Sequence, residues 1–327
     1  MDEDLRDCEN NYDLDYELRM VTNMTTELQT QLGLAADLQI AAALKAYLGD
    51  VFTDYAHDVD LSFYDVVEDV ALGDSVRLHH ESHIMNANQS SYTLYIPVRQ
   101  YMHLAVANIN NNGTVSMEGD ELCHGARLVQ VSRDTVENHR TGLFTARLPM
   151  HIQEGEDQTF DVSLYMANCA SSLILDTLGS HIKDIRVYAS GFATEFSLCD
   201  SVYRFSHPSV VRSERIALDQ PGSLCFTTVS FPSRDVRPDT KVVIETEEPF
   251  VSESADEAIW QYEVYTRMPD GKTTKSLLGI SQPLRAGQLK IIKVRVLDDG
   301  AVQPLDSQVS VNVALDWSRG MDFPVEF

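Results

Sequence analysis

The chain has 327 residues, 43% of them hydrophobic, and carries 50 acidic side chains against 25 basic ones, for a formal net charge of −25. This balance argues against nucleic acid and against an anionic membrane surface as partners, because both bind clustered Lys and Arg. No apolar run reaches the roughly eighteen residues of a membrane-spanning helix. The hydrophobic fraction is that of a globular protein, and the length suits two ordinary domains.

The first eleven residues predict a flexible acidic tether, because five acidic side chains stand there against a single Arg6. Met1 is followed at once by Asp2, Glu3 and Asp4, which is not the start of a signal peptide. Either the protein is cytosolic, or the sequence is a mature fragment with an added Met1. The acidic start favours the second explanation.

A strand is predicted from Tyr12 to Val21, where apolar and charged residues alternate. The charged outer row suggests a solvent-exposed or edge position in a sheet. A helix follows: Thr26 to Gln29 fits a capping box, and apolar residues recur at helical spacing as far as Leu48. Gly33 could divide this helix, and its apolar face is expected to pack on the sheet.

Short strands fill the remainder of the first half. The alternating runs are Val59–Phe63, Val76–His80, Tyr92–Ile96, Met102–Val106, Leu143–Leu148 and Phe160–Met166. Gly and Asn turns separate them, as at Gly73-Asp74 and Asn110 to Gly113. Many short strands with such turns indicate a β-sandwich or a barrel.

The second half repeats this pattern. Its predicted strands are Leu173–Leu175, Ile182–Tyr188, Ala193–Leu198, Val242–Ile244, Trp260–Thr266, Ser276–Ile280, Leu289–Leu297 and Val309–Trp317. Pro269-Asp270-Gly271 predicts a hairpin turn. A polar stretch at residues 152–160 suggests a domain boundary, which gives an N-terminal β-sandwich with a helical insertion over 12–157 and a C-terminal β-sandwich over 158–327. A single large sandwich remains the alternative.

The cysteines do not point to a disulfide scaffold or a zinc ribbon, because the count is odd and no two lie in a C-x-x-C pair. They are Cys8, Cys123, Cys169, Cys199 and Cys225. The last three fall in apolar, strand-like runs, so buried free thiols are expected there.

Catalytic motifs are absent from the sequence: it has no G-x-S-x-G elbow, no P-loop and no G-x-G-x-x-G. The nearest pattern to a metal site is His79-His80-Glu81-Ser82-His83. On a strand, His79, Glu81 and His83 would share one face, but solvent-facing polar side chains are the preferred interpretation. The acidic pairs Asp58 with Asp60 and Asp298 with Asp299 are best explained by turn chemistry. We therefore assign no catalytic, cofactor-binding or metal residues and expect no cofactor.

The order of these features resembles the fimbrillin-associated anchor and minor-subunit proteins of the Bacteroidales, the FimB/Mfa type. The resemblance is carried by the acidic start with Cys8, the strand at Tyr12–Val21 with the helix after it, and four further strands. Those strands are Val59–Asp65, Tyr101–Asn108, Ile185–Phe192 and Val311–Trp317. It spans nearly the whole chain, although the helix is longer than that family's pattern and the Trp expected near Ala107 is absent.

The resemblance implies two tandem transthyretin-like β-sandwiches in a cell-adhesion lipoprotein of the outer membrane, anchored by an N-terminal lipid that this sequence lacks. It also implies partners, which are fimbrial subunits joined by β-strand addition. Four triplets look like O-glycosylation sites of those bacteria, and they begin at Asp74, Asp134, Asp176 and Asp200. The alternatives are a glycan-binding surface lipoprotein, which would need exposed aromatic residues on one face, and a metal-dependent hydrolase that uses His79 and His83.

The pairing of the last strand, Val309–Trp317, bears on which of these functions the chain has. The turn at Asp298 to Gly300 and a short loop tie it to Leu289–Leu297, so we expect it to pair within its own chain, as in an anchor or terminal subunit. An acceptor groove would then lie elsewhere, near Tyr12–Val21.

Overall fold

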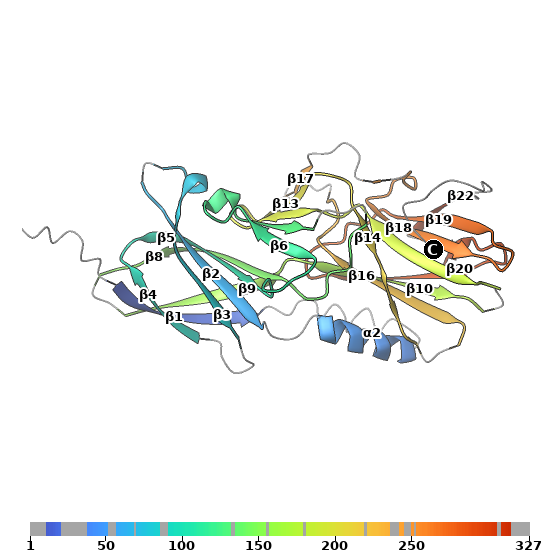
Figure 1. Ribbon diagram of the computed structural model, residues 1–327, viewed down its shortest axis with the longest axis horizontal. Helices are drawn as coiled ribbons and strands as arrows, with labels where there is room; N and C mark the ends of the chain where they lie inside the picture. The colour runs from blue at the N-terminus through green and yellow to red at the C-terminus, as the bar shows by residue number, and fades with distance from the viewer. Residues whose placement is uncertain are drawn as a thin grey trace, which may run out of the picture.

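The structure is a computed structural model that describes residues 11–20, 38–51, 57–68, 70–85, 91–131, 135–154, 157–178, 181–218, 221–235, 242–244, 250–251, 253–305 and 309–314. It is mostly β, with one α-helix after the first strand and several largely antiparallel sheets. The molecule is elongated, and the two halves of the chain occupy opposite ends (Figure 1). None of the described helices has the length and apolarity needed to cross a membrane.

A seven-stranded sheet forms the first end, in the order β3-β2-β5-β8-β9-β1-β4. Its strands are β1 (Asn11–Met20), β2 (Asp58–Asp65), β3 (Arg77–Ile84), β4 (Ser91–Pro97), β5 (Gln100–Ala107), β8 (Phe144–His151) and β9 (Gln158–Met166). Only the end of β9 pairs with β8, at Tyr165 and Met166, while its longer first part runs parallel to β1. Side chains from β2, β5 and β8 meet those from β4 and β9 in one core, which includes Phe63, Leu94, Tyr101, Phe144 and Leu164.

Strand β1 confirms the predicted element but not its predicted position. Asp13 and Asp15 are exposed, as the charged row requires. However, β1 pairs with β4 on one side and β9 on the other. The strand is therefore internal to the sheet, with Leu14–Glu17 paired on both sides, and the expected acceptor groove at Tyr12–Val21 is wrong because its central backbone is already bonded within the sheet.

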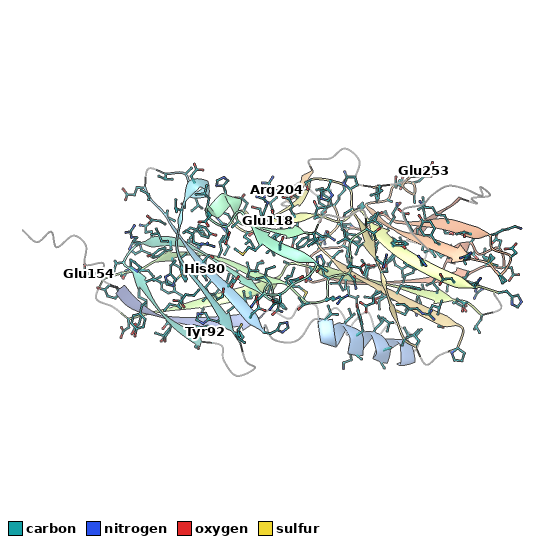
Figure 2. The ribbon with its side chains drawn as sticks, viewed as in Figure 1. His80, Tyr92, Glu118, Glu154, Arg204 and Glu253 are labelled. Carbon is teal, nitrogen blue, oxygen red and sulfur yellow. The ribbon has the colours of Figure 1, made fainter. Side chains whose placement is uncertain are left out.

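A five-stranded sheet in the middle of the molecule takes strands from both halves of the chain, in the order β17-β13-β12-β7-β6. They are β6 (Val115–Glu118), β7 (Arg127–Gln130), β12 (Glu195–Ser197), β13 (Val202–Phe205) and β17 (Val242–Ile244). Glu118 on β6 and Arg204 on β13 mark its two parts in Figure 2. The side chains beneath it, from Tyr64 and Leu104 to Phe205 and Phe231, form a core that belongs to neither half alone.

Two further five-stranded sheets form the other end. One has the order β15-β16-β10-β20-β21 and the other β14-β11-β18-β19-β22. Their strands are β10 (Cys169–Asp176), β11 (Asp184–Ser190), β14 (Val210–Arg212), β15 (Glu214–Ile216), β16 (Ser223–Ser230), β18 (Trp260–Arg267), β19 (Thr273–Ile280), β20 (Leu289–Val296), β21 (Val302–Pro304) and β22 (Val309–Ala314). The core between them holds Trp260, whose indole N–H donates to the Gln282 carbonyl at 2.9 Å.

The helix α2 (Leu38–Val51) lies on the second end of the molecule although it precedes β2 in sequence (Figure 1). Ile40, Leu44 and Leu48 are buried against Cys225 and Leu289 of the β15-β16-β10-β20-β21 sheet. The expectation that its apolar face packs on a sheet is confirmed. The predicted start at Thr26 and the break at Gly33 lie outside the described residues.

The last strand is paired within its own chain, as predicted, but with a different partner. β22 runs antiparallel to β19, with Val309 opposite Ile280 and Ala314 opposite Lys275. The expected pairing with Leu289–Leu297 is wrong, because β20 takes β21 after the Asp298–Gly300 turn. Residues 315–317 of the predicted strand lie outside the described part of the chain.

Several strands are not predicted by the sequence. Most have three or four residues, too few for an alternating pattern to emerge: β6, β7, β13, β14, β15 and β21. The longer β16 is hidden for another reason. Thr227, Thr228 and Ser230 are buried in it. Thr227 pairs with the Ser172 hydroxyl at 3.0 Å, Thr228 pairs with the Ser213 hydroxyl at 2.7 Å, and the Ser230 hydroxyl donates to the Phe231 carbonyl at 3.0 Å. A strand with buried hydroxyl groups on both faces does not alternate in polarity.

Candidate functional site

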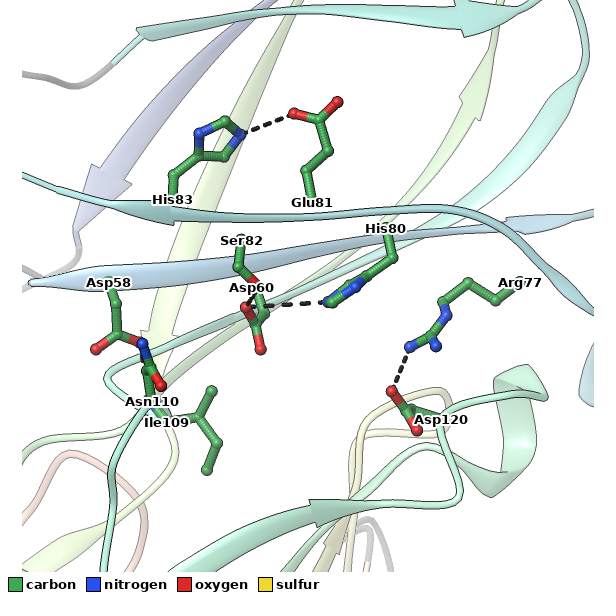
Figure 3. Close-up of polar contacts among 10 residues, drawn as sticks. All are labelled: Asp58, Asp60, Arg77, His80, Glu81, Ser82, His83, Ile109, Asn110 and Asp120. Atoms are coloured by element: carbon green, nitrogen blue, oxygen red, sulfur yellow. Dashed lines mark hydrogen bonds and ion pairs between the residues drawn. The ribbon is translucent and has the colours of Figure 1, made fainter.

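The open edge of strand β3 is the feature of the first sheet that is best suited to contact another protein. Among the described residues, β3 has a strand neighbour, β2, on one side only. Its beginning is covered, because the Arg77 N–H donates to the Glu121 carbonyl at 3.0 Å and the Arg77 guanidinium pairs with Asp120 (Figure 3). From Leu78 onward no described segment closes this side.

The backbone of β3 presents unused hydrogen-bonding groups along that side. The Met85 N–H donates to the His57 carbonyl at 2.9 Å, which makes this a hydrogen-bonded pair with the strand before it. Since such pairs alternate in antiparallel sheets, Glu81 and His83 also bond toward β2. The N–H groups of His80, Ser82 and Ile84 then point to the open side.

The outer face of β3 is mixed, because the exposed polar residues His80 and Ser82 share it with apolar side chains. Val76, Leu78 and Ile84 are 53%, 45% and 82% exposed. The polar row at His79, Glu81 and His83, expected to face solvent, is half-buried and faces inward. The alternation in the sequence shows that two rows exist but not which row is covered. An exposed edge strand with apolar side chains is a known site of strand pairing between chains.

The inward row holds the histidines that were candidates for a metal site. His79 Nε2 lies 2.9 Å from Glu81 Oε1, so this ring bonds to the Glu81 carboxylate. His83 Nε2 lies 3.0 Å from Glu81 Oε2 and bonds to the same carboxylate (Figure 3). The three do share one face, as expected. Within the described part of the chain, no three His, Cys, Asp or Glu side chains are grouped to hold a metal ion.

Aromatic rings pack against the inward row that contains His79 and His83. The His79 ring meets Phe63 edge-on at a centroid distance of 5.7 Å, and the His83 ring packs on Tyr92 at 4.5 Å. On the other face, His80 Nε2 is 3.9 Å from Asp60 Oδ1, and the Ser82 hydroxyl donates to the same carboxylate. Figure 2 shows His80 and Tyr92 at the end of the molecule built by the first half. The histidines hold the edge strand to its neighbours.

One member of each acidic pair, Asp58 and Asp299, has the turn role that the sequence suggests, whereas Asp60 lies within β2 and contacts Ser82 of β3. Asp58 Oδ1 accepts the N–H groups of Ile109 and Asn110, both at 3.1 Å, and burial raises the pKa of this carboxyl above its usual value. Asp299 Oδ1 accepts the Ala301 N–H at 3.0 Å. Both carboxylates close loops of their own chain.

A polar pocket of about 490 Å³ lies between the β5–β6 loop and residues 137–141. Asparagines build its wall: Asn108, at a φ of 65°, accepts the His57 N–H at 2.8 Å and donates to the Gly142 carbonyl at 2.8 Å. Exposed side chains of the lining are Asn110, Asn111, Glu137 and Arg140. The sequence marks this Asn run only as a turn, since nothing in it reveals the facing segment.

The glycosylation triplets differ in exposure. The Ser75 side chain is buried, at 2% exposure, so the first triplet does not offer its hydroxyl to solvent in the folded chain. Thr135, Thr177 and Ser201 are half-buried. Asp134 lies outside the described residues.

Comparisons with known proteins decide the family. A sequence profile described as "fimbrillin-A associated anchor proteins Mfa1 and Mfa2" matches residues 26–202, more than half of the chain. The chain belongs to this family. Membership confirms the resemblance and makes the chain a fimbrial anchor or adhesin type of protein of the cell surface, in a family that associates with fimbrillin-A fimbriae and is not enzymatic.

Solved structures share the fold of this anchor-family chain at low identity. The fimbrial anchor protein Mfa2 from Porphyromonas gingivalis is 10% identical with a TM-score of 0.51, over 92% of this chain and 97% of that one. A candidate adhesin from Bacteroides ovatus is 10% identical with a TM-score of 0.54, over 95% and 96%. A candidate polysaccharide-binding protein from Bacteroides thetaiotaomicron is 11% identical with a TM-score of 0.51, over 90% and 99%. No curated protein matches the sequence.

Proposed function

We propose that this chain is an anchor or accessory subunit of a fimbria and that it accepts a β-strand from a fimbrial subunit along the open side of β3. The family match over residues 26–202 supports the anchor role. The exposed edge supports the mode of assembly. A strand laid against β3 would receive the N–H groups of His80, Ser82 and Ile84, and would cover the apolar side chains of Leu78 and Ile84.

This edge fits strand addition better than the alternatives within the described residues. It is eight residues long, whereas the other edge strands are shorter, from three residues in β14, β15, β17 and β21 to four in β6, six in β22 and seven in β4. Backbone bonds grow in number with length, and side-chain rows fix the register, so a longer edge gives a stronger and more specific joint. The outward side chains also carry no Lys or Arg to repel an incoming strand.

The overall organisation we propose is two tandem transthyretin-like β-sandwiches. The division expected at 157/158 would fall after β9 instead, near Ala167, because β9 is part of the first sheet. We also propose attachment to the outer membrane through an N-terminal lipid outside this sequence. Metabolic labelling of the full-length precursor with a fatty acid checks the lipid, and a precursor that takes up no label contradicts it.

The substitution Ser82→Pro tests the proposed pairing of a subunit strand with β3. Proline removes the outward N–H at that position while leaving the bonds to β2, so the isolated protein should keep its fold and lose binding to fimbrial subunits. Ser82→Ala is the matched control, because it changes the side chain alone and loses the same contact to Asp60. Capture of subunits from a cell-envelope extract measures binding. A folded Ser82→Pro protein that captures subunits as well as Ser82→Ala does would overturn the use of this edge.

The second candidate function is glycan binding, which the polar pocket favours. Amide, guanidinium and carboxylate groups at Asn110, Asn111, Arg140 and Glu137 can hydrogen-bond sugar hydroxyls, and a volume of about 490 Å³ is that of a small-ligand site. The described lining contains no Phe, Tyr or Trp ring for stacking. A glycan array with the purified chain decides this: specific hits lost in Arg140→Ala support it, and an array without hits removes it.

A further inference from the structure

Two cysteines from opposite halves of the chain meet in the central core. The Sγ atoms of Cys123 and Cys199 are 2.7 Å apart, and the residues are 0% and 2% exposed. Nonbonded carbon atoms settle at about 3.5–4.0 Å, and sulfur is larger than carbon. A disulfide needs about 2.05 Å. The two sulfur atoms are therefore closer than nonbonded sulfur atoms normally lie, and a small movement would bring them to the length of a disulfide bond.

The backbone around the pair is held in register from both sides. Cys123 opens the short 3-10 helix η3 (Cys123–Gly125), which leads into β7, and Cys199 lies in the turn directly after β12. The two strands pair with Ser197 opposite Arg127, and the Leu198 N–H donates to the Ala126 carbonyl at 2.9 Å. The cysteines stand at the end of this pairing.

The two cysteines lie where strands from the two halves of the chain meet. Strands β7 and β12 are the neighbours through which first-half and second-half strands share the middle sheet, and their register has only three residue pairs. The ion pair across it, from Arg127 to Glu195 at 3.8 Å, is partly exposed and contributes little. A covalent link at this point would close a loop between residues 76 positions apart in sequence.

We propose that Cys123 and Cys199 form a disulfide that locks the two halves of the chain together. Two thiols lose two protons and two electrons when the S–S bond forms. The electrons go to the disulfide of an oxidant of the dithiol-oxidoreductase class, or to oxidised glutathione in vitro, which leaves as thiols after thiol–disulfide exchange. Since both sulfurs are buried in the folded chain, the exchange takes place during folding, before the central core closes.

The contact between the sulfurs also perturbs both thiols in the folded chain. The hydrogen bond between them raises the pKa of Cys123 and lowers that of Cys199. The cell-surface location of the family suits the bond, because disulfides persist in oxidising compartments. The inference does not depend on strand addition at β3.

The remaining described cysteines serve as internal controls. Cys169 is buried, and its Sγ lies 3.6 and 3.5 Å from the carbonyl oxygens of Ser230 and Phe231. Burial raises the pKa of Cys169 and of Cys225, each to about 12, so neither is a good nucleophile.

The pairing is tested on the full chain with Cys8→Ser, which removes the one cysteine outside the described residues. The protein is refolded with oxidised and reduced glutathione, denatured, and alkylated with N-ethylmaleimide. We expect two alkylated cysteines without a reductant and four after reduction, with a linked peptide pair containing Cys123 and Cys199. Four alkylated cysteines without reduction, or a linked pair of other residues, would overturn the proposal.

The lock itself is tested by stability and hydrogen exchange. On reduction, Tm should fall by about 5 °C and the Gln130 and Leu198 amides at the β7–β12 join should exchange faster. Cys199→Ser, in the same background, should show three alkylated cysteines and no response to reductant, whereas Cys225→Ala should keep the response. A reductant response in Cys199→Ser equal to that of the parent would contradict a lock at this pair.

Discussion

Strands β1 and β3 belong to the same sheet and both alternate in sequence, yet their positions are opposite. β1 has a charged outer row at Asp13 and Asp15 and lies between β4 and β9. β3 has apolar side chains on its outer face, at Leu78 and Ile84, and lies at the edge. A charged row is thus no sign of an edge. Polarity identifies the water-facing row in β1 but not in β3, and the neighbours of both strands are set by topology.

Proline substitutions should show the largest difference between β1 and β3, as a difference in the loss of unfolding free energy. Asp15→Pro removes a ladder bond inside the sheet and should cost about 3 kcal/mol or more of unfolding free energy, because proline is not tolerated in a central strand. Ser82→Pro at the outward side of β3 should cost about 1 kcal/mol or less. Urea denaturation followed by circular dichroism measures both. Equal losses would mean that the open side of β3 is closed in solution.

Buried histidines should make the unfolding free energy depend on pH, and this effect should be intermediate in size. His103 and His139 are fully buried, and burial lowers the pKa of each to about 3. Because the folded pKa lies below the unfolded value of about 6.5, their contribution is complete above pH 6.5 and is lost as the pH falls toward 3. Unfolding free energy should therefore drop by about 1.4 kcal/mol per pH unit for each of them below pH 6.

His139→Phe isolates this term. Both ring nitrogens of His139 lack a partner among the described residues, and its ring meets Phe231 edge-on, so a phenyl ring should be accepted. The variant should lose roughly half of the acid sensitivity while keeping its stability at pH 7.5. Ser190→Ala is the control, because it changes a buried polar side chain that does not titrate, and it should keep the acid sensitivity of the parent. A His139→Phe protein as acid-sensitive as the parent would contradict the assignment.

Apolar side chains on the β3 edge should matter least to stability. Ile84→Lys places a charge at a position that is 82% exposed, so unfolding free energy should change by less than about 0.5 kcal/mol. Self-association at high concentration should decrease, since a lysine on an edge strand opposes pairing. Light scattering checks this, with Ile84→Val as the control. If Ile84→Lys unfolds the chain, the side chain is covered in solution.

The sequence predicts faces and elements far better than partners. Alternation located β1, β5, β18 and β20, and helical spacing located α2, because these patterns are local. The partner of β22 could not be read from the Asp298–Gly300 turn, since β21 intervenes with only three residues. The inward row of β3 was misassigned because His79 and His83 are polar, and burial against Phe63 and Tyr92 depends on residues far along the chain. Neither the asparagine pocket nor the Cys123–Cys199 contact has a local signal, because each joins segments distant in sequence.

The position of α2 has a consequence for how the chain reaches this fold. Leu44 and Leu48 are made early in synthesis, but the surface they pack on includes Leu289, which is added near the end. Contacts over such a separation in sequence slow folding, because a long loop must close before they form. The helix therefore keeps an uncovered apolar face while most of the chain is still emerging. The yield of such a chain should therefore be limited by aggregation of incomplete chains more than by the stability of the finished fold.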